Sequence, residues 1–284
     1  MTGLLAAAVL NSSGGSSAED SVRLIKVGDI SIAYRVFGSG DPLVLIMGYG
    51  STMELWEPGL IRSLSASHQV ILFDNRGMGN SEAGQRPFSI EQFADDTAGL
   101  VEALGLGKVH LLGWSMGALI AEEVALRHPQ KVDKLILYAS QCRADLYPPA
   151  PEIIQKMTDT SGTPEEQGMR FISVLFPADW LQSHGPRLQE IFYRPMGNIP
   201  PEIVGRQSEA IDSWKGCCER LGEIKHPALV IAGADDVLVP AQNSRYLAEK
   251  LPKARLALFE NNGHGLMFQS PDLFAGAVTE FLKK

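Results

Sequence analysis

Cysteine, clustered positive charge and long apolar runs are all scarce in this sequence of 284 residues. The three cysteines, Cys142, Cys217 and Cys218, fit neither a disulfide framework nor the spacing of a zinc site. We therefore interpret them as core or surface thiols. The chain is expected to fold without disulfides, and its sequence implies no metal and no organic cofactor.

The distribution of charge argues against nucleic acid as a partner. The chain has 25 Lys and Arg against 33 Asp and Glu, which gives a formal net charge of -8. No block of basic residues could neutralise a row of phosphates. No apolar run is long enough to cross a bilayer, so we expect no integral membrane segment. These features make no prediction of the oligomeric state.

The first 21 residues are expected to form a flexible tail or the remnant of a signal peptide. The apolar run from Leu4 to Leu10 and the small residues at 16–18 resemble the middle and the cleavage site of a signal peptide. The opening Met1-Thr2-Gly3 supplies no positive charge, which such a peptide requires. A cytoplasmic location is therefore favoured, with export as the alternative if residues 1–18 are a truncated signal peptide.

From residue 22 the hydrophobic pattern alternates between strands and helices. Residues 22–27 and 30–36 predict an opening hairpin. Short apolar runs rich in β-branched residues predict strands buried on both faces, and a further strand and four amphipathic helices complete the pattern. The expected buried strands are 43–47, 70–73, 109–112, 135–138 and 229–232, the later strand is 255–259, and the helices are 91–104, 118–127, 244–251 and 271–282. This alternation predicts an α/β fold with a mostly parallel sheet and flanking helices.

Residues 143–222 interrupt this alternation with amphipathic stretches and many prolines, and they contain no buried strand run. We interpret them as a helical cap inserted into a core of residues 22–142 and 223–284. An insertion between two strands of one sheet would lie over the carboxyl edge, where ligands bind in open α/β folds.

A serine in a glycine-rich turn is the candidate nucleophile. Gly113-Trp114-Ser115-Met116-Gly117 follows one expected strand and precedes an expected helix, which is the context of a nucleophile elbow. The two glycines suit the sharp turn, where a Cβ atom would collide with neighbouring backbone. The alternative is an ordinary turn between a strand and a helix.

A serine hydroxyl needs a base, and His264 is the best placed of the six histidines. It lies in Asn261-Asn262-Gly263-His264-Gly265, just after the last strand and therefore at the same edge as Ser115. The other histidines occupy element ends, a strand or the cap, where structural roles are usual.

The acid that orients this histidine is expected in the loop that follows strand 229–232. Asp235 and Asp236 both qualify, and the one that does not face the imidazole would cap the helix that begins near Pro240. Either choice gives the order Ser, acid, His, which is typical of α/β-hydrolases.

The chain resembles the esterase, haloperoxidase and lactonase branch of the α/β-hydrolase superfamily. The resemblance spans residues 43–265 and is carried by Gly48-Tyr49-Gly50, the segment 73–81, Gly113 to Gly117, Gly233 to Pro240 and Gly263-His264. In that family the acid lies three residues after the glycine, which implies Asp236 rather than Asp235. The Asp74-Asn75-Arg76-Gly77 run is a structural turn in similar proteins, and we favour that role here.

The resemblance also implies an oxyanion hole formed by the backbone amides of Tyr49 and Met116. Family members usually carry His-Gly before the first of these residues, whereas this chain has Met47-Gly48. The bracing of the loop by hydrogen bonds is therefore in question. We expect Gly48 and Trp114 to line the substrate pocket, with packing beneath the elbow as the alternative for Trp114.

The expected activity is hydrolysis of small to medium carboxylic esters or lactones through an acyl-enzyme on Ser115. Serine at the elbow argues against dehalogenase and epoxide hydrolase chemistry, which uses aspartate there. Carbon-carbon hydrolysis of meta-cleavage products and a cofactor-free haloperoxidase or perhydrolase activity are the enzymatic alternatives. A ligand receptor on the same fold is the alternative without catalysis.

Overall fold

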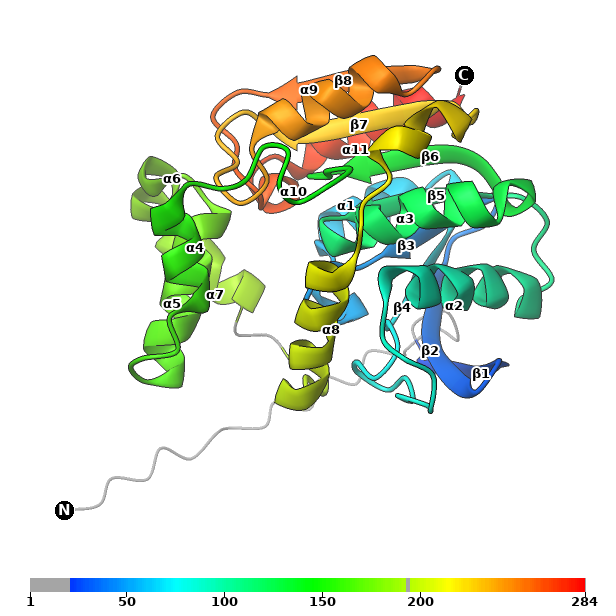
Figure 1. Cartoon of the computed structure of the whole chain (residues 1–284), viewed down its shortest axis with the longest axis horizontal. Coiled ribbons are helices and arrows are strands. Elements are labelled where there is room, and N and C mark those ends of the chain that lie inside the picture. Colours follow the sequence, from blue (N-terminus) through cyan, green and yellow to red (C-terminus); the bar gives the residue numbers. More distant parts are fainter. Residues whose placement is uncertain (1–20, 193–194, 284) are drawn as a thin grey trace.

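The computed structural model describes residues 21–192 and 195–283 (Figure 1). The prediction of a tail or signal remnant falls mostly on residues 1–20, which lie outside this described part. Within it, no helix combines the length and apolar character needed to span a membrane.

Eight strands form one sheet in the order β1-β2-β4-β3-β5-β6-β7-β8. β1 and β2 pair antiparallel, β2 is antiparallel to β4, and the remaining neighbours are parallel. Every strand expected from the sequence is present, and the predicted fold class is confirmed. The strands are β1 (Arg23–Val27), β2 (Ile30–Phe37), β3 (Asp41–Ile46), β4 (His68–Phe73), β5 (Val109–Trp114), β6 (Val132–Tyr138), β7 (Ala228–Gly233) and β8 (Ala254–Phe259).

Helices cover both faces of the sheet, and their apolar sides form two separate cores (Figure 1). One face carries α2 (Ile90–Ala103), α3 (Met116–Arg127) and α9 (Ala241–Lys250). The other face carries α1 (Pro58–Ser65), α10 (Leu266–Gln269) and α11 (Pro271–Lys283). The four predicted helices correspond to α2, α3, α9 and α11, whereas α1 was not among the expectations.

Among its described residues, the segment between β6 and β7 contains five α-helices, a short 3-10 helix (Cys218–Glu223) and no strand. In Figure 1, α4 to α7 form one group at the edge of the molecule and α8 lies apart from them. The helices are α4 (Pro151–Thr158), α5 (Pro164–Leu175), α6 (Ala178–Ser183), α7 (Gly185–Phe192) and α8 (Pro201–Ser213).

The expectation of three free thiols is wrong, because Cys142 and Cys218 form a disulfide. These cysteines are 76 residues apart in sequence, but they lie just after β6 and just before β7, which are neighbours in the sheet. The disulfide therefore joins the two ends of the helical segment. Cys217 remains a buried thiol, and its Sγ lies 3.1 Å from a carboxylate oxygen of Glu122. Burial raises the pKa of the Glu122 carboxyl to about 8.

Reduction of this disulfide is expected to lower the free energy of unfolding, by about 4 kcal/mol at most, because it frees a long loop in the unfolded chain. Urea unfolding with and without a phosphine reductant measures the loss. The Cys218→Ser variant serves as the control, since the reductant should leave its unfolding curve unchanged. Identical curves for the intact protein before and after reduction, with thiol titration showing the bond cut, would contradict the expectation.

Candidate active site

Ser115 lies at the carboxyl end of β5, at the first position of the turn into α3. Its φ of 54° and ψ of -120° are unusual for a residue with a side chain. The backbone amide donates to the Tyr138 carbonyl at 2.9 Å, which fixes the turn to the neighbouring strand β6. The side chain is half-buried and reaches a cavity at this edge of the sheet.

The two glycines of the motif are required by close backbone approach. A Cβ atom on Gly113 would collide with the carbonyl of Gly117, and one on Gly117 would collide with the carbonyl of Ile46 on β3. Helix α3 therefore starts close against the sheet.

His264 and Asp236 form a buried pair behind this serine. His264 Nδ1 lies 2.8 Å from Asp236 Oδ2, and both residues are almost fully buried. The other Asp236 oxygen accepts the backbone amides of Leu238 and Val239, each at 2.9 Å. The carboxylate is thereby held in one orientation. As an acceptor at Nδ1, it places the ring proton there and leaves Nε2 free to take a proton.

Asp235 does not have the role expected for the second acid of the loop. It is exposed, and its backbone amide donates to the Asn262 carbonyl. The predicted helix cap is wrong, because α9 begins after Pro240 without any side-chain cap. Pro240 occupies the N-cap position, and its ring carries no oxygen that could accept an amide of the first helical turn.

Aromatic residues hold the backbone of His264 in place. Its carbonyl accepts hydrogen bonds from the Trp114 indole at 3.2 Å and from the Tyr138 hydroxyl at 2.5 Å. The Trp114 and Tyr138 rings are stacked, with centroids 5.8 Å apart. Trp114 also borders the cavity, so the same ring packs on Tyr138 and lines this space.

The cavity beside Ser115 encloses about 180 Å³ and receives residues from both the sheet and the helical segment. It brings together four residues expected at the site, Gly48, Tyr49, Trp114 and Ser115, with His264. Met116 is buried in the first turn of α3 and does not border the cavity. None of the described lining residues is acidic, Lys or Arg; the others are Ser51, Leu55, Met157, Phe171, Leu175, Ile211, Leu238 and Val239.

The loop after β3, residues 47–52, has hydrogen bonds despite the unusual Met47. We call it the oxyanion loop. Asn75 Nδ2 donates to the Met47 carbonyl at 3.0 Å, and the Gly50 amide donates to Gln207 Oε1 at 2.9 Å. Thr52 Oγ1 donates to the carbonyl of Met196. Side chains distant in sequence therefore stabilise the loop that the Met47-Gly48 departure had put in question.

The Asp74 to Gly77 turn has the structural role that was favoured from the sequence. Asp74 accepts the backbone amides of Met53 and Asn80, and burial raises the pKa of its carboxyl. Arg76 is buried and binds Asp96 and Asp29. Burial opposes its charge, but these hydrogen bonds outweigh that cost and raise its pKa.

Sequence reasoning missed two residues of the site, Asn75 and Gln207. Asn75 lies in the segment 73–81, which carries part of the family resemblance, so the sequence did draw attention to its position. Gln207 lies 157 residues from Gly50 and carries no local signal.

Comparisons with known proteins place the chain in a family. A model of the alpha/beta hydrolase fold family matches residues 41–271. The chain is 32% identical over 248 residues to the protein named "Putative carbamate hydrolase RutD" of Azorhizobium caulinodans, across 87% of this chain and 93% of that protein.

Solved structures agree with this match. The enol-lactonase from Burkholderia xenovorans LB400 aligns with a TM-score of 0.79 and 25% identity, covering 92% of this chain and all of that one. A thermophilic esterase from Thermogutta terrifontis aligns with a TM-score of 0.80 and 25% identity, covering 93% and 98%. The resemblance seen in the sequence is confirmed, and the chain belongs to the alpha/beta hydrolase family.

Proposed function

We propose that this hydrolase cleaves neutral carboxylic esters or lactones of small to medium size through an acyl-enzyme on Ser115. The observation that carries the proposal is the cavity, where Ser115 and His264 lie beside a lining that, among the described residues, includes no Asp, Glu, Lys or Arg. Its volume of about 180 Å³ is below the range of typical drug-sized pockets, which favours short acyl groups.

The proposed reaction begins when Ser115 Oγ attacks the carbonyl carbon and His264 Nε2 takes the hydroxyl proton. Asp236 stabilises the resulting imidazolium through its 2.8 Å contact with Nδ1. The protonated histidine then gives its proton to the leaving alkoxide, and the acyl-enzyme remains. Water attacks that ester with the same histidine as base, which releases the acid and restores the serine.

The tetrahedral intermediates need hydrogen-bond donors, for which we propose the backbone amides of Tyr49 and Met116. Met116 starts α3, so its amide has no partner within the helix and lies at the positive end of the helix dipole. Tyr49 lies in the oxyanion loop, whose position is fixed by the hydrogen bonds of Asn75 and Gln207.

The helical segment 143–222 is proposed to act as the cap over a core of residues 22–142 and 223–284. Met157 on α4, Phe171 and Leu175 on α5 and Ile211 on α8 all border the cavity. The Gly265 amide donates to the Leu175 carbonyl at 2.8 Å, which also connects the cap to the loop of His264. The cap therefore contributes much of the apolar surface that would surround an acyl group.

A carbamate is the second candidate substrate, because the curated relatives are named as carbamate hydrolases. Free carbamate is an anion, and the part of the lining that the structure describes supplies no Lys or Arg to bind it. The same consideration disfavours meta-cleavage products, which are also carboxylates. Neutral esters and lactones fit the lining better.

A substrate panel tests this assignment. We expect kcat/KM for p-nitrophenyl butyrate to exceed that for the mono-p-nitrophenyl ester of succinic acid by at least about 30-fold, since burying an unpaired carboxylate is costly. The two esters share a leaving group and differ mainly in one charge. Equal rates for the two esters would contradict the proposal.

A further inference from the structure

We infer that Gln207, on helix α8 of the cap, is a positioning residue for the oxyanion hole. The inference rests on the proposed function, because it concerns how the Tyr49 amide is held toward the intermediate. It adds to the catalytic residues a side chain that touches no reacting atom and acts through the backbone of Gly50.

The contact between Gln207 and the oxyanion loop is specific. Gln207 Oε1 accepts the Gly50 amide at 2.9 Å, and the Gln207 side chain is fully buried. Gly50 has a φ of 65°, a left-handed conformation that favours glycine. The accepted amide belongs to the peptide that directly follows Tyr49, so the hydrogen bond fixes the plane next to the proposed donor.

The second polar atom of the Gln207 side chain indicates why the residue is there. Its Nε2 is buried and has no hydrogen-bond partner within the described part of the chain. A buried unsatisfied donor costs about 1 to 3 kcal/mol, a cost that a leucine or methionine would avoid. The nitrogen therefore gives no reason for a glutamine at this position, and the atom that explains the residue is the oxygen that accepts the Gly50 amide.

Other residues of the cap also contact the core, one of them at the same loop. The Tyr49 hydroxyl interacts with Ser208, and the Gly79 amide donates to the Asn198 carbonyl at 2.8 Å. Ile211, one turn beyond Gln207 on α8, borders the cavity. Helix α8 thus contacts both the substrate space and the oxyanion loop, and Gln207 is where it contacts the loop backbone.

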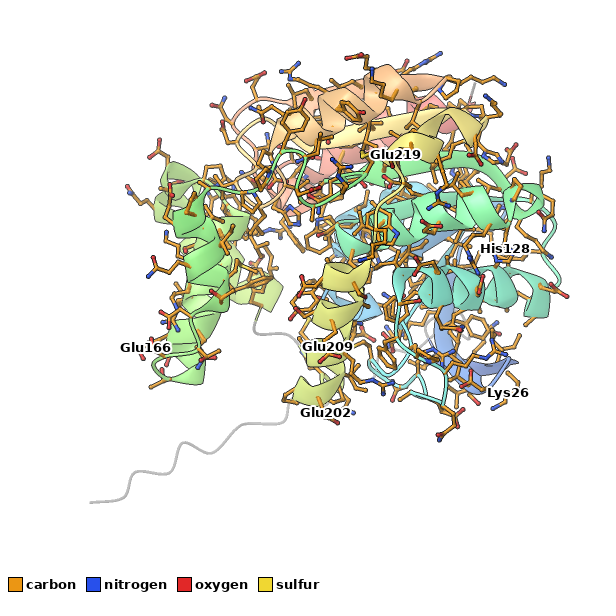
Figure 2. All side chains as sticks on the ribbon, in the orientation of Figure 1. Lys26, His128, Glu166, Glu202, Glu209 and Glu219 are labelled. Atoms are coloured by element: carbon orange, nitrogen blue, oxygen red, sulfur yellow. A yellow bond between two sulfur atoms is a disulfide. The ribbon has the colours of Figure 1, made fainter. Side chains whose placement is uncertain are left out.

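The test compares Gln207→Met with Gln207→Glu. Methionine has a similar shape without an acceptor, whereas glutamate keeps a side-chain oxygen in any protonation state. Glu209→Met is the matched control, because Glu209 is exposed on the same helix (Figure 2). Gln207→Asn, which withdraws the oxygen by one methylene, replaces the methionine variant if that variant does not fold.

Two readouts separate a positioning role from a purely structural one. The first is kcat against KM for p-nitrophenyl butyrate. The second is Ki for 1,1,1-trifluoropentan-2-one, whose carbonyl carbon accepts Ser115 Oγ while the serine proton passes to His264, giving a tetrahedral oxyanion. Loss of one oxyanion donor typically costs 100-fold to 1,000-fold, so displacing one without removing it should cost about ten-fold.

We expect Gln207→Met to lower kcat and weaken the ketone by about ten-fold each, with KM within two-fold of wild type. Gln207→Glu should restore both values, and Glu209→Met should change neither. An unchanged ketone Ki in a folded Gln207→Met or Gln207→Asn protein would overturn the inference alone. Ester turnover that does not depend on Ser115 would instead overturn the proposed function.

Discussion

Replacing Ser115 by alanine is expected to lower kcat/KM for p-nitrophenyl butyrate by about 100,000-fold. The substitution removes the oxygen that attacks the substrate carbonyl in the first step of the proposed mechanism. The residual rate would come from the oxyanion donors and from binding alone. Initial rates of p-nitrophenol release, corrected for the uncatalysed reaction, measure the effect.

The structure offers a matched control for this variant. Ser173 on α5 donates its hydroxyl to the Arg170 carbonyl of its own helix, so Ser173→Ala should keep nearly all activity. Circular dichroism and urea unfolding show whether Ser115→Ala is folded. Retention of more than a tenth of the wild-type rate would assign turnover to another group.

The sheet could be predicted from the sequence because its signal is local. Strands such as β3, β5 and β7 are buried on both faces, so each appears as a short continuous apolar run bounded by polar residues. Helix α1 was missed because its local signal in the sequence is weak. It has eight residues, and its cap is Glu57, which is not among the usual capping residues.

The disulfide shows a second limit of prediction from the sequence, because the pairing of cysteines depends on the fold. Cys142 and Cys218 become neighbours only because β6 and β7 pair in the sheet, a fact of topology rather than of spacing. Once the insertion between two adjacent strands was predicted, the cysteines at its two ends could have been paired. Count and spacing alone pointed to free thiols.

Some residues of the candidate site could be predicted from local sequence patterns, whereas others depend on contacts between distant parts of the chain. Ser115 and His264 follow β5 and β8, which run in the same direction in one sheet, so their place at a common edge follows from that direction. The support of the oxyanion loop depends on Asn75 and Gln207, which are 28 and 157 residues from their partners. The Gln207 contact has no local pattern, because it arises from the packing of α8 against the loop after β3, whereas Asn75 lies within the segment 73–81 that carries the family resemblance.

Asp236→Asn and Asp235→Asn together test which acid orients His264. The expected loss in kcat is about 10,000-fold for the first variant and less than two-fold for the second. Asparagine at 236 can still accept the amides of Leu238 and Val239 with its oxygen. Its amide nitrogen would then face His264 Nδ1 and donate to it, so the ring proton would move to Nε2.

That change of tautomer removes the acceptor that Ser115 needs, although the loop and the fold are kept. Asp235 is exposed, and within the described part of the chain its backbone amide donates to the Asn262 carbonyl. The same loss of charge at this position therefore leaves the orientation of His264 unchanged. The two variants therefore carry identical chemical changes at adjacent positions, and each serves as the other's control. A larger loss from Asp235→Asn than from Asp236→Asn would mean that the buried carboxylate at 2.8 Å is not the one that supports catalysis.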